Sequence, residues 1–109
     1  MRMIKVIVYF FLIIFLTTST CSKAIGIESG EKLFSQNCSA CHLGGINIII
    51  PEKNLKKETL AENGMNSISA ISYQILNGKN GMPAFGGRLT EEEIEKIANY
   101  VLVSSWKEF

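Results

Sequence analysis

Cys38-Ser39-Ala40-Cys41-His42 is the segment of this 109-residue chain on which the other structural predictions depend. The pattern Cys-x-x-Cys-His is typical of the attachment of a c-type haem. The chemistry sets the spacing, because two thiols add to the two vinyl groups of the porphyrin while the adjacent histidine turns its imidazole onto the iron. The sequence therefore predicts one covalently bound haem c, attached through Cys38 and Cys41, with His42 as the first axial ligand of its iron.

Two other kinds of site also use closely spaced cysteines. A thioredoxin-like redox pair opens a helix that follows a strand, and no strand pattern precedes Cys38. A four-ligand zinc site needs a second pair of ligands, whereas the whole chain has three cysteines and one histidine. The motif thus favours haem over both alternatives.

The second axial ligand has to be something other than histidine. His42 is the only histidine of the chain, so a haem with two histidine ligands within one protomer is excluded. A methionine thioether is the usual partner of histidine in c-type electron carriers, and Met65 and Met82 are the candidates in the mature chain. Both lie between turn residues, so the pattern alone does not choose. Met82 is favoured because its glycine-rich loop joins two predicted helices and can reach over the face opposite His42.

Two protein ligands on the iron would decide the type of reaction. A filled coordination sphere leaves no position for oxygen or a substrate, so electrons can pass through the haem edge but atoms cannot be transferred. The chain is therefore expected to be an electron carrier and not an enzyme, with a potential raised by the methionine thioether.

The N-terminus reads as a secretory leader. A basic start at residues 1–5 precedes an unbroken apolar run at 6–16, and small residues at 22 and 24 suit a signal peptidase. The run is shorter than the roughly 20 residues of a spanning helix, which makes a retained membrane anchor the less favoured alternative. We predict that the signal peptide, 1–24, is removed and that 25–109 forms one exported domain that is not embedded in a membrane.

Removal of the leader changes the charge of the chain. Arg2, Lys5 and Lys23 leave with it, so 11 − 3 = 8 basic residues face all 10 acidic ones and the mature charge is 8 − 10 = −2. Nucleic-acid binding requires a basic face, so proteins are the expected partners. We also expect the protein to be a monomer. Cys21 also leaves, and the residues before it do not favour the alternative of a lipidated cysteine.

Four helical segments and two loops can be placed on the mature chain. The helices are expected at about 28–40, at 55–62, after the capping residue Ser67 as far as Asn77, and after a capping box of Thr90 and Glu93 as far as about residue 104. The loops are expected at 43–54 and 78–88, which contain glycine and proline. The chain is therefore expected to be all-α.

With these segments placed, the chain resembles the cytochrome c6 family across essentially all of 25–106. The resemblance rests on the haem motif, on Gly44-Gly45 with Asn47, and on an ordered set of later segments: PEKNLKK at 51–57, NGMN at 63–66, ISYQ at 71–74 and, above all, NGKNGMPAFGGRL at 77–89. It implies a class I cytochrome c fold, in which about four helices wrap around one covalently bound haem c.

The resemblance also implies roles for individual residues. Met82 would be the sixth ligand of the iron, the carbonyl of Pro51 would accept the ring N–H of His42, and Gln74 would lie near the haem as a tuning group. Gly30, Phe34 and Tyr100 would form the contact where the first and last helices cross. Two positions depart from the usual pattern of the family, which has asparagine where Ile46 stands and alanine where Gly81 stands.

The function implied by the resemblance is photosynthetic electron transport. A soluble monohaem carrier would take single electrons from the cytochrome b6f complex to photosystem I in the thylakoid lumen of a plastid or cyanobacterium, with Arg88 at the interface with photosystem I. One alternative is a bacterial class I cytochrome c that serves an oxidase or a dehydrogenase. The other is a small haem enzyme or gas sensor with a removable sixth ligand.

Overall fold

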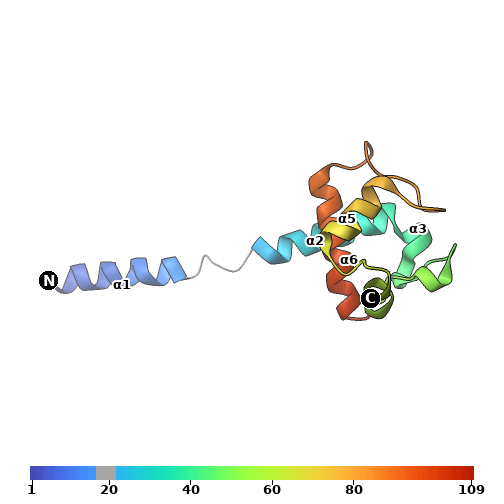
Figure 1. Ribbon diagram of the computed structural model, residues 1–109. Coiled ribbons are helices and arrows are strands. Elements are labelled where there is room, and N and C mark those ends of the chain that lie inside the picture. The colour runs from blue at the N-terminus through green and yellow to red at the C-terminus, as the bar shows by residue number, and fades with distance from the viewer. Residues whose placement is uncertain (17–21) are drawn as a thin grey trace.

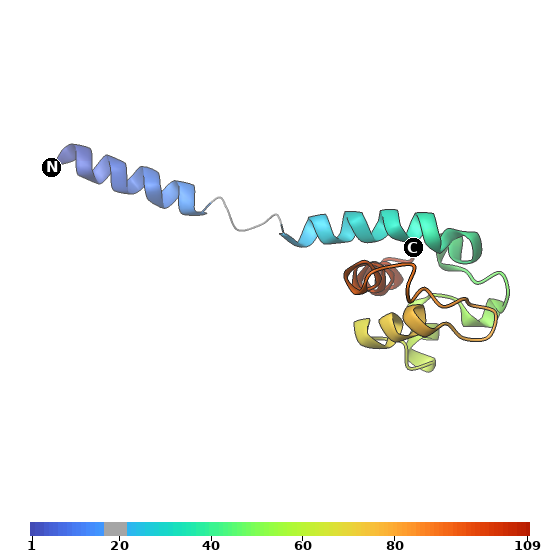
Figure 2. The same ribbon diagram turned by 90° about the horizontal axis from the view of Figure 1, so that it is seen from above.

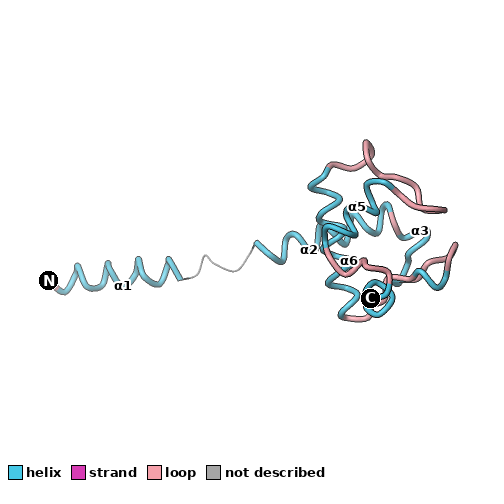
Figure 3. Tube along the Cα trace, in the orientation of Figure 1, coloured by secondary structure: helices cyan, strands magenta, loops and turns pink. Residues whose placement is uncertain are grey.

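The computed structural model describes residues 1–16 and 22–109, and within these ranges the chain forms helices and no strand (Figures 1 and 3). The elements are α1 (Arg2–Leu16), α2 (Ser22–Asn37), α3 (Ser39–His42), the 3-10 turns η1 (Leu43–Gly45) and η2 (Pro51–Lys53), α4 (Lys57–Glu62), α5 (Ile68–Asn77) and α6 (Glu91–Trp106). This architecture confirms the all-α prediction. Cys21 and the polar residues 17–20 lie outside the described residues.

The helix caps read from the sequence are confirmed. Ser67 Oγ accepts the N–H of Ala70 at 3.2 Å, which caps α5. At α6, Thr90 Oγ1 accepts the N–H of Glu93 at 3.2 Å, and Glu93 Oε1 accepts the N–H of Thr90 at 3.0 Å. Both starts were predictable because each cap depends only on residues three apart in the sequence.

The first predicted helix is wrong at both of its ends. In place of one helix at 28–40, α2 ends at Asn37, and the short α3 continues after Cys38 as far as His42. The break lies at Cys38, where φ is −116°, so the motif spans a kink between two helices. The predicted cleavage site, between residues 24 and 25, falls within the first turn of α2. The last helix also extends two residues beyond the predicted end, to Trp106.

The N-terminal and C-terminal helices of the domain cross at a glycine (Figure 2). A Cβ added to Gly30 would lie 2.4 Å from the carbonyl oxygen of Lys96 and 2.9 Å from Cβ of Tyr100, so α2 and α6 approach too closely for any other residue. Next to the crossing, the rings of Phe34 and Tyr100 pack with centroids 5.2 Å apart. The contact implied by the family resemblance is therefore confirmed. Phe109 adds a third ring, 5.8 Å from that of Phe34.

The core lies where α2, α5 and α6 meet. Its buried apolar side chains are Phe34, Leu60, Ile71, Ile75, Phe85, Ile94, Ile97, Ala98 and Val101. Several of them also face a cavity, so the same helices that form the core form the walls of the candidate site. In Figure 1, α1 stands apart from this bundle. None of the helices within residues 1–16 and 22–109 combines the length and the apolar character needed to cross a bilayer.

Candidate cofactor site

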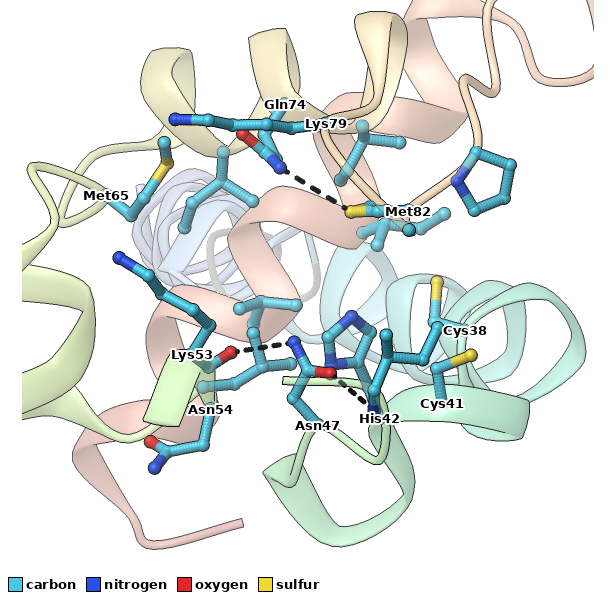
Figure 4. Close-up of a pocket in the computed structure, with 18 of the residues that line it drawn as sticks. Cys38, Cys41, His42, Asn47, Lys53, Asn54, Met65, Gln74, Lys79 and Met82 are labelled. Atoms are coloured by element: carbon cyan, nitrogen blue, oxygen red, sulfur yellow. Dashed lines mark hydrogen bonds between the residues drawn. The ribbon is translucent and has the colours of Figure 1, made fainter. Parts of the chain in front are cut away.

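A cavity of about 520 Å³ opens between the loops and the inner faces of the helices. This volume suits a cofactor, since ligand pockets usually measure about 300–1,000 Å³. Its walls are mostly apolar and include Ile71, Ile75, Ile97 and Val101 from the core. Cys38, Cys41 and His42 line one side of it, and Met82 lies across from the His42 ring (Figure 4). A flat, largely apolar group with a metal at its centre fits between them.

The ring of His42 is held by a backbone carbonyl. Its Nδ1 lies 2.8 Å from the carbonyl oxygen of Ile46, so Nδ1–H donates a hydrogen bond and the lone pair of Nε2 remains for a metal. The expectation that Pro51 would supply this carbonyl is wrong. The carbonyl of Pro51 instead accepts a bond from Asn54 Nδ2 at 3.4 Å.

A tight turn after the motif explains this correction. Gly44 and Gly45 have φ values of +66° and +78°, which glycine adopts without strain, and they turn the chain back below the imidazole. The carbonyl of Ile46, four residues after His42, thereby comes within reach of Nδ1. Because a backbone carbonyl makes the contact, the departure from asparagine at Ile46 does not remove it.

The two cysteines of the motif are half-buried beside His42. Burial raises the pKa of Cys38 to about 11, because desolvation disfavours the thiolate. A neutral group therefore suits this position, and a thioether to a porphyrin is neutral. With both sulfurs on one wall of the cavity (Figure 4), the pair can hold one edge of a flat cofactor.

Met82 and Met65 both line the cavity, but they occupy different places in it. Met82 lies across from His42, whereas Met65 lies toward the side (Figure 4). Gln74, which the resemblance placed near the haem, donates from Nε2 to Sδ of Met82 at 3.8 Å. The arrangement supports Met82 as the second axial ligand, and the assignment stays a prediction.

The loop that carries Met82 is shaped by a two-residue turn. Lys79 and Met82 exchange backbone hydrogen bonds of 3.1 and 3.0 Å around Asn80 and Gly81. A Cβ at Gly81 would lie 3.1 Å from Cγ2 of Ile49, so the turn packs closely on the preceding loop. The departure from alanine at Gly81 thus coincides with a close approach between the two loops that border the cavity.

Asn47 has a structural role that the residue pattern did not reveal. Its Oδ1 accepts the N–H groups of Ile49 and Ile50 at 3.0 and 2.9 Å, and its Nδ2 donates to the carbonyl of Lys53 at 3.1 Å. One side chain therefore organises the loop that borders the cavity. An asparagine in a loop is a known signal for such side-chain turns, but its partners are set by the fold.

Three cations lie at the edge of the cavity. Lys53, Lys79 and Arg88 line it, and all three are exposed to solvent. The guanidinium of Arg88 lies 5.7 Å from the centre of the Phe85 ring, which places it beside the buried apolar wall. The mouth of the cavity is therefore positively charged, although the mature chain is expected to be weakly acidic overall.

Comparisons with known proteins find one matching family model and several relatives that are named cytochrome c6. Residues 26–101 match the family model described as "Cytochrome C oxidase, cbb3-type, subunit III". Cytochrome c6 of Bumilleriopsis filiformis is 63% identical over 79 residues, which cover 72% of this chain and 92% of that protein. Cytochrome c6 of Petalonia fascia is 59% identical over 83 residues, which cover 76% and 98%. The crystal structure of cytochrome c6 from the diatom Phaeodactylum tricornutum matches with a TM-score of 0.74 and 48% identity, over 76% of this chain and 98% of that one.

Proposed function

Because the chain belongs to the cytochrome c6 family, we propose that it carries single electrons from the cytochrome b6f complex to photosystem I. Membership makes it a haem protein with the class I cytochrome c fold, and an electron carrier and not an enzyme. The choice of donor and acceptor is the part that we propose.

The proposed site uses four side chains. Cys38 and Cys41 would hold haem c through two thioethers, while His42 Nε2 and Met82 Sδ would bind its iron. The single observation that carries this proposal is the cavity with the Cys-x-x-Cys-His wall on one side and the Met82 thioether on the other (Figure 4). When bound, the haem supplies an iron that accepts and releases one electron.

The side chains around the cavity suit electron transfer more than bond chemistry. With His42 and Met82 both bound to the iron, no position on the metal would remain for a substrate. The apolar walls would favour the less charged state of a bound metal centre and so would raise its potential. Gln74 donates toward the Met82 sulfur and so restrains the direction in which that sulfur points. The residues therefore hold the site in one geometry while only an electron moves.

The cations at the mouth of the cavity suit recognition by an acidic partner. Arg88 and Lys79 are exposed there, and exposed charges guide the encounter of two proteins before they dock. We place Arg88 at the interface with photosystem I, as the family resemblance implied. The short distance from Arg88 to the Phe85 ring supports this placement, because it keeps the charge next to the cavity edge.

The proposed compartment is the thylakoid lumen of a plastid or a cyanobacterium. Export with removal of residues 1–24 would leave a soluble monomeric domain of 25–109. Two observations support this. Residues 2–16 form an apolar helix, α1, of the kind found in leaders. Relatives matched over 92% and 98% of their own length cover only 72% and 76% of this chain.

Flash kinetics test the proposed partners. Reduced, haem-loaded protein is mixed with photosystem I, and re-reduction of the flash-oxidised reaction centre is followed in time. We expect a rate that rises with the concentration of the carrier and falls with salt, and we expect the oxidised carrier to be reduced by isolated cytochrome b6f complex. Absence of either reaction would overturn the proposed route.

The name of the matched family model supports one alternative, a carrier that serves an oxidase. That model describes a subunit of a cbb3-type oxidase, a protein that also works in electron transport. An oxidase partner predicts that this carrier is oxidised by a cbb3-type oxidase faster than by photosystem I. The relatives at about 60% identity bear the name cytochrome c6, which favours photosystem I.

A further inference from the structure

Three Asn-Gly pairs occur in the chain, at 63–64, 77–78 and 80–81. In such a pair the backbone nitrogen of the glycine can attack the side-chain carbonyl carbon of the asparagine, because glycine has no Cβ to block the approach. The reaction needs an asparagine side chain that is free to rotate and a glycine N–H that is not held by a hydrogen bond. The three pairs differ in whether the structure meets these two requirements.

The pair at 63–64 is held in place at the end of α4. Asn63 Nδ2 donates to the carbonyl of Thr59 at 2.8 Å, and its Oδ1 accepts a hydrogen bond from the ammonium of Lys53. The N–H of Gly64 donates to the carbonyl of Ala61 at 3.2 Å. Both the group that would be attacked and the nitrogen that would attack it are therefore occupied.

The pair at 77–78 is held in the same way at the end of α5. Asn77 Nδ2 donates to the carbonyl of Tyr73 at 2.9 Å, and the N–H of Gly78 donates to the carbonyl of Gln74 at 2.8 Å. The glycine bond is part of the cap of the helix, so attack at this pair requires the end of α5 to open.

The pair at 80–81 is free in both respects. Asn80 and Gly81 form the exposed tip of the turn between Lys79 and Met82. Among the interactions within residues 1–16 and 22–109, neither the side chain of Asn80 nor the N–H of Gly81 has a hydrogen-bond partner. Asn80 also has a φ of +52°, in the left-handed region that asparagine enters more readily than most residues with a side chain, as expected at the tip of a tight turn.

We propose that Asn80 is a site of spontaneous deamidation. The backbone nitrogen of Gly81 forms a bond to Cγ of Asn80, the bond from Cγ to the amide nitrogen breaks, and ammonia leaves. The cyclic imide that results takes up one water molecule and opens to aspartate or to isoaspartate. The net reaction consumes water, releases ammonia and adds one negative charge at the tip of the turn.

Deamidation of Asn80 is expected to change the cavity, because the turn at 79–82 borders it. An aspartate at position 80 brings a carboxylate beside Lys79 at the cationic mouth. An isoaspartate lengthens the backbone by one methylene, and the reciprocal hydrogen bonds of 3.1 and 3.0 Å between Lys79 and Met82 then no longer match. The isoaspartate form is therefore expected to displace Met82, whereas the aspartate form leaves its backbone in place.

Tryptic mapping of aged holoprotein tests the proposal cleanly. Cleavage after Lys57, Lys79 and Arg88 places Asn80 in the peptide 80–88, while Asn63 and Asn77 share the peptide 58–79. Haem-loaded protein is incubated at mildly alkaline pH, sampled over time and digested, and a sample taken at the start reports any reaction during digestion. Since at least two hydrogen bonds must break first in each of the other pairs, 80–88 is expected to convert about tenfold faster or more.

Two controls make the result decisive. In denatured protein the hydrogen bonds that distinguish the three pairs are lost, so peptides 80–88 and 58–79 should convert at similar rates. Asn80→Gly removes the amide at a φ that glycine tolerates, and it should abolish the new acidic species on ion exchange. Conversion of 58–79 as fast as 80–88 in the folded protein overturns the proposal. So does a peptide 80–88 that stays unmodified while the denatured protein converts.

Discussion

Replacement of Met82 by alanine is the sharpest test of the site, and Met65→Ala is its matched control. Both methionines are half-buried and line the same cavity, but only Met82 lies across from His42 (Figure 4). We expect Met82→Ala to open the iron to external ligands and to lower the potential, since the thioether favours ferrous iron. Met65→Ala is expected to do neither.

The magnitudes show which measurement can separate the two variants. Truncation of a fully buried methionine costs about 2–5 kcal/mol of unfolding free energy, so either half-buried side chain should cost about 1–3 kcal/mol. Stability therefore does not discriminate. A coordinating bond worth only about 3 kcal/mol would weaken carbon monoxide binding to the parent about 150-fold, because each 1.4 kcal/mol is a factor of ten. Ligand binding is the discriminating measurement.

The assay combines a ligand titration with visible spectra. Reduced parent and variants are titrated with carbon monoxide, and the oxidised proteins are examined for the weak far-red absorption of methionine-ligated ferric haem. We expect Met82→Ala to bind carbon monoxide at least about a hundredfold more tightly than the parent and to lose the far-red band. The reverse pattern, in which Met65→Ala opens the iron, would refute the assignment. If neither variant opens it, another side chain or a partner supplies the ligand.

Three further outcomes follow from the same structure. Intact-mass spectrometry of the exported protein should give the mass of residues 25–109 plus one haem, starting at Ile25, and a retained or lipidated leader would contradict the predicted processing. Arg88→Glu should slow reduction of photosystem I several-fold at low salt and leave the haem spectrum unchanged, and equal rates would remove Arg88 from the interface. Gly30→Ala places a Cβ 2.4 Å from the Lys96 carbonyl oxygen and should lower the unfolding free energy by about 1–3 kcal/mol in thermal or denaturant unfolding. An unchanged stability would mean that the helices can separate at the crossing without cost.

The features that the sequence alone determined depend on residues close together in the chain. The haem motif is set by the fixed spacing of Cys38, Cys41 and His42. The starts of α5 and α6 depend on Ser67 and Thr90, whose hydroxyls bond N–H groups three residues later. Local interactions of this kind do not depend on the rest of the fold, and these predictions were confirmed wherever the structure tests them.

Tertiary structure decided which groups meet across the cavity. Met65 and Met82 lie in similar turn sequences, and only the packing of their loops shows that Met82 lies across from His42. The hydrogen-bond partner of the His42 ring was likewise wrongly predicted to be Pro51. Two glycines with positive φ turn the chain so that the carbonyl of Ile46 lies next to the ring instead. Such contacts depend on where a loop returns in space, and that path results from the balance of many packing and hydrogen-bond terms along the whole loop.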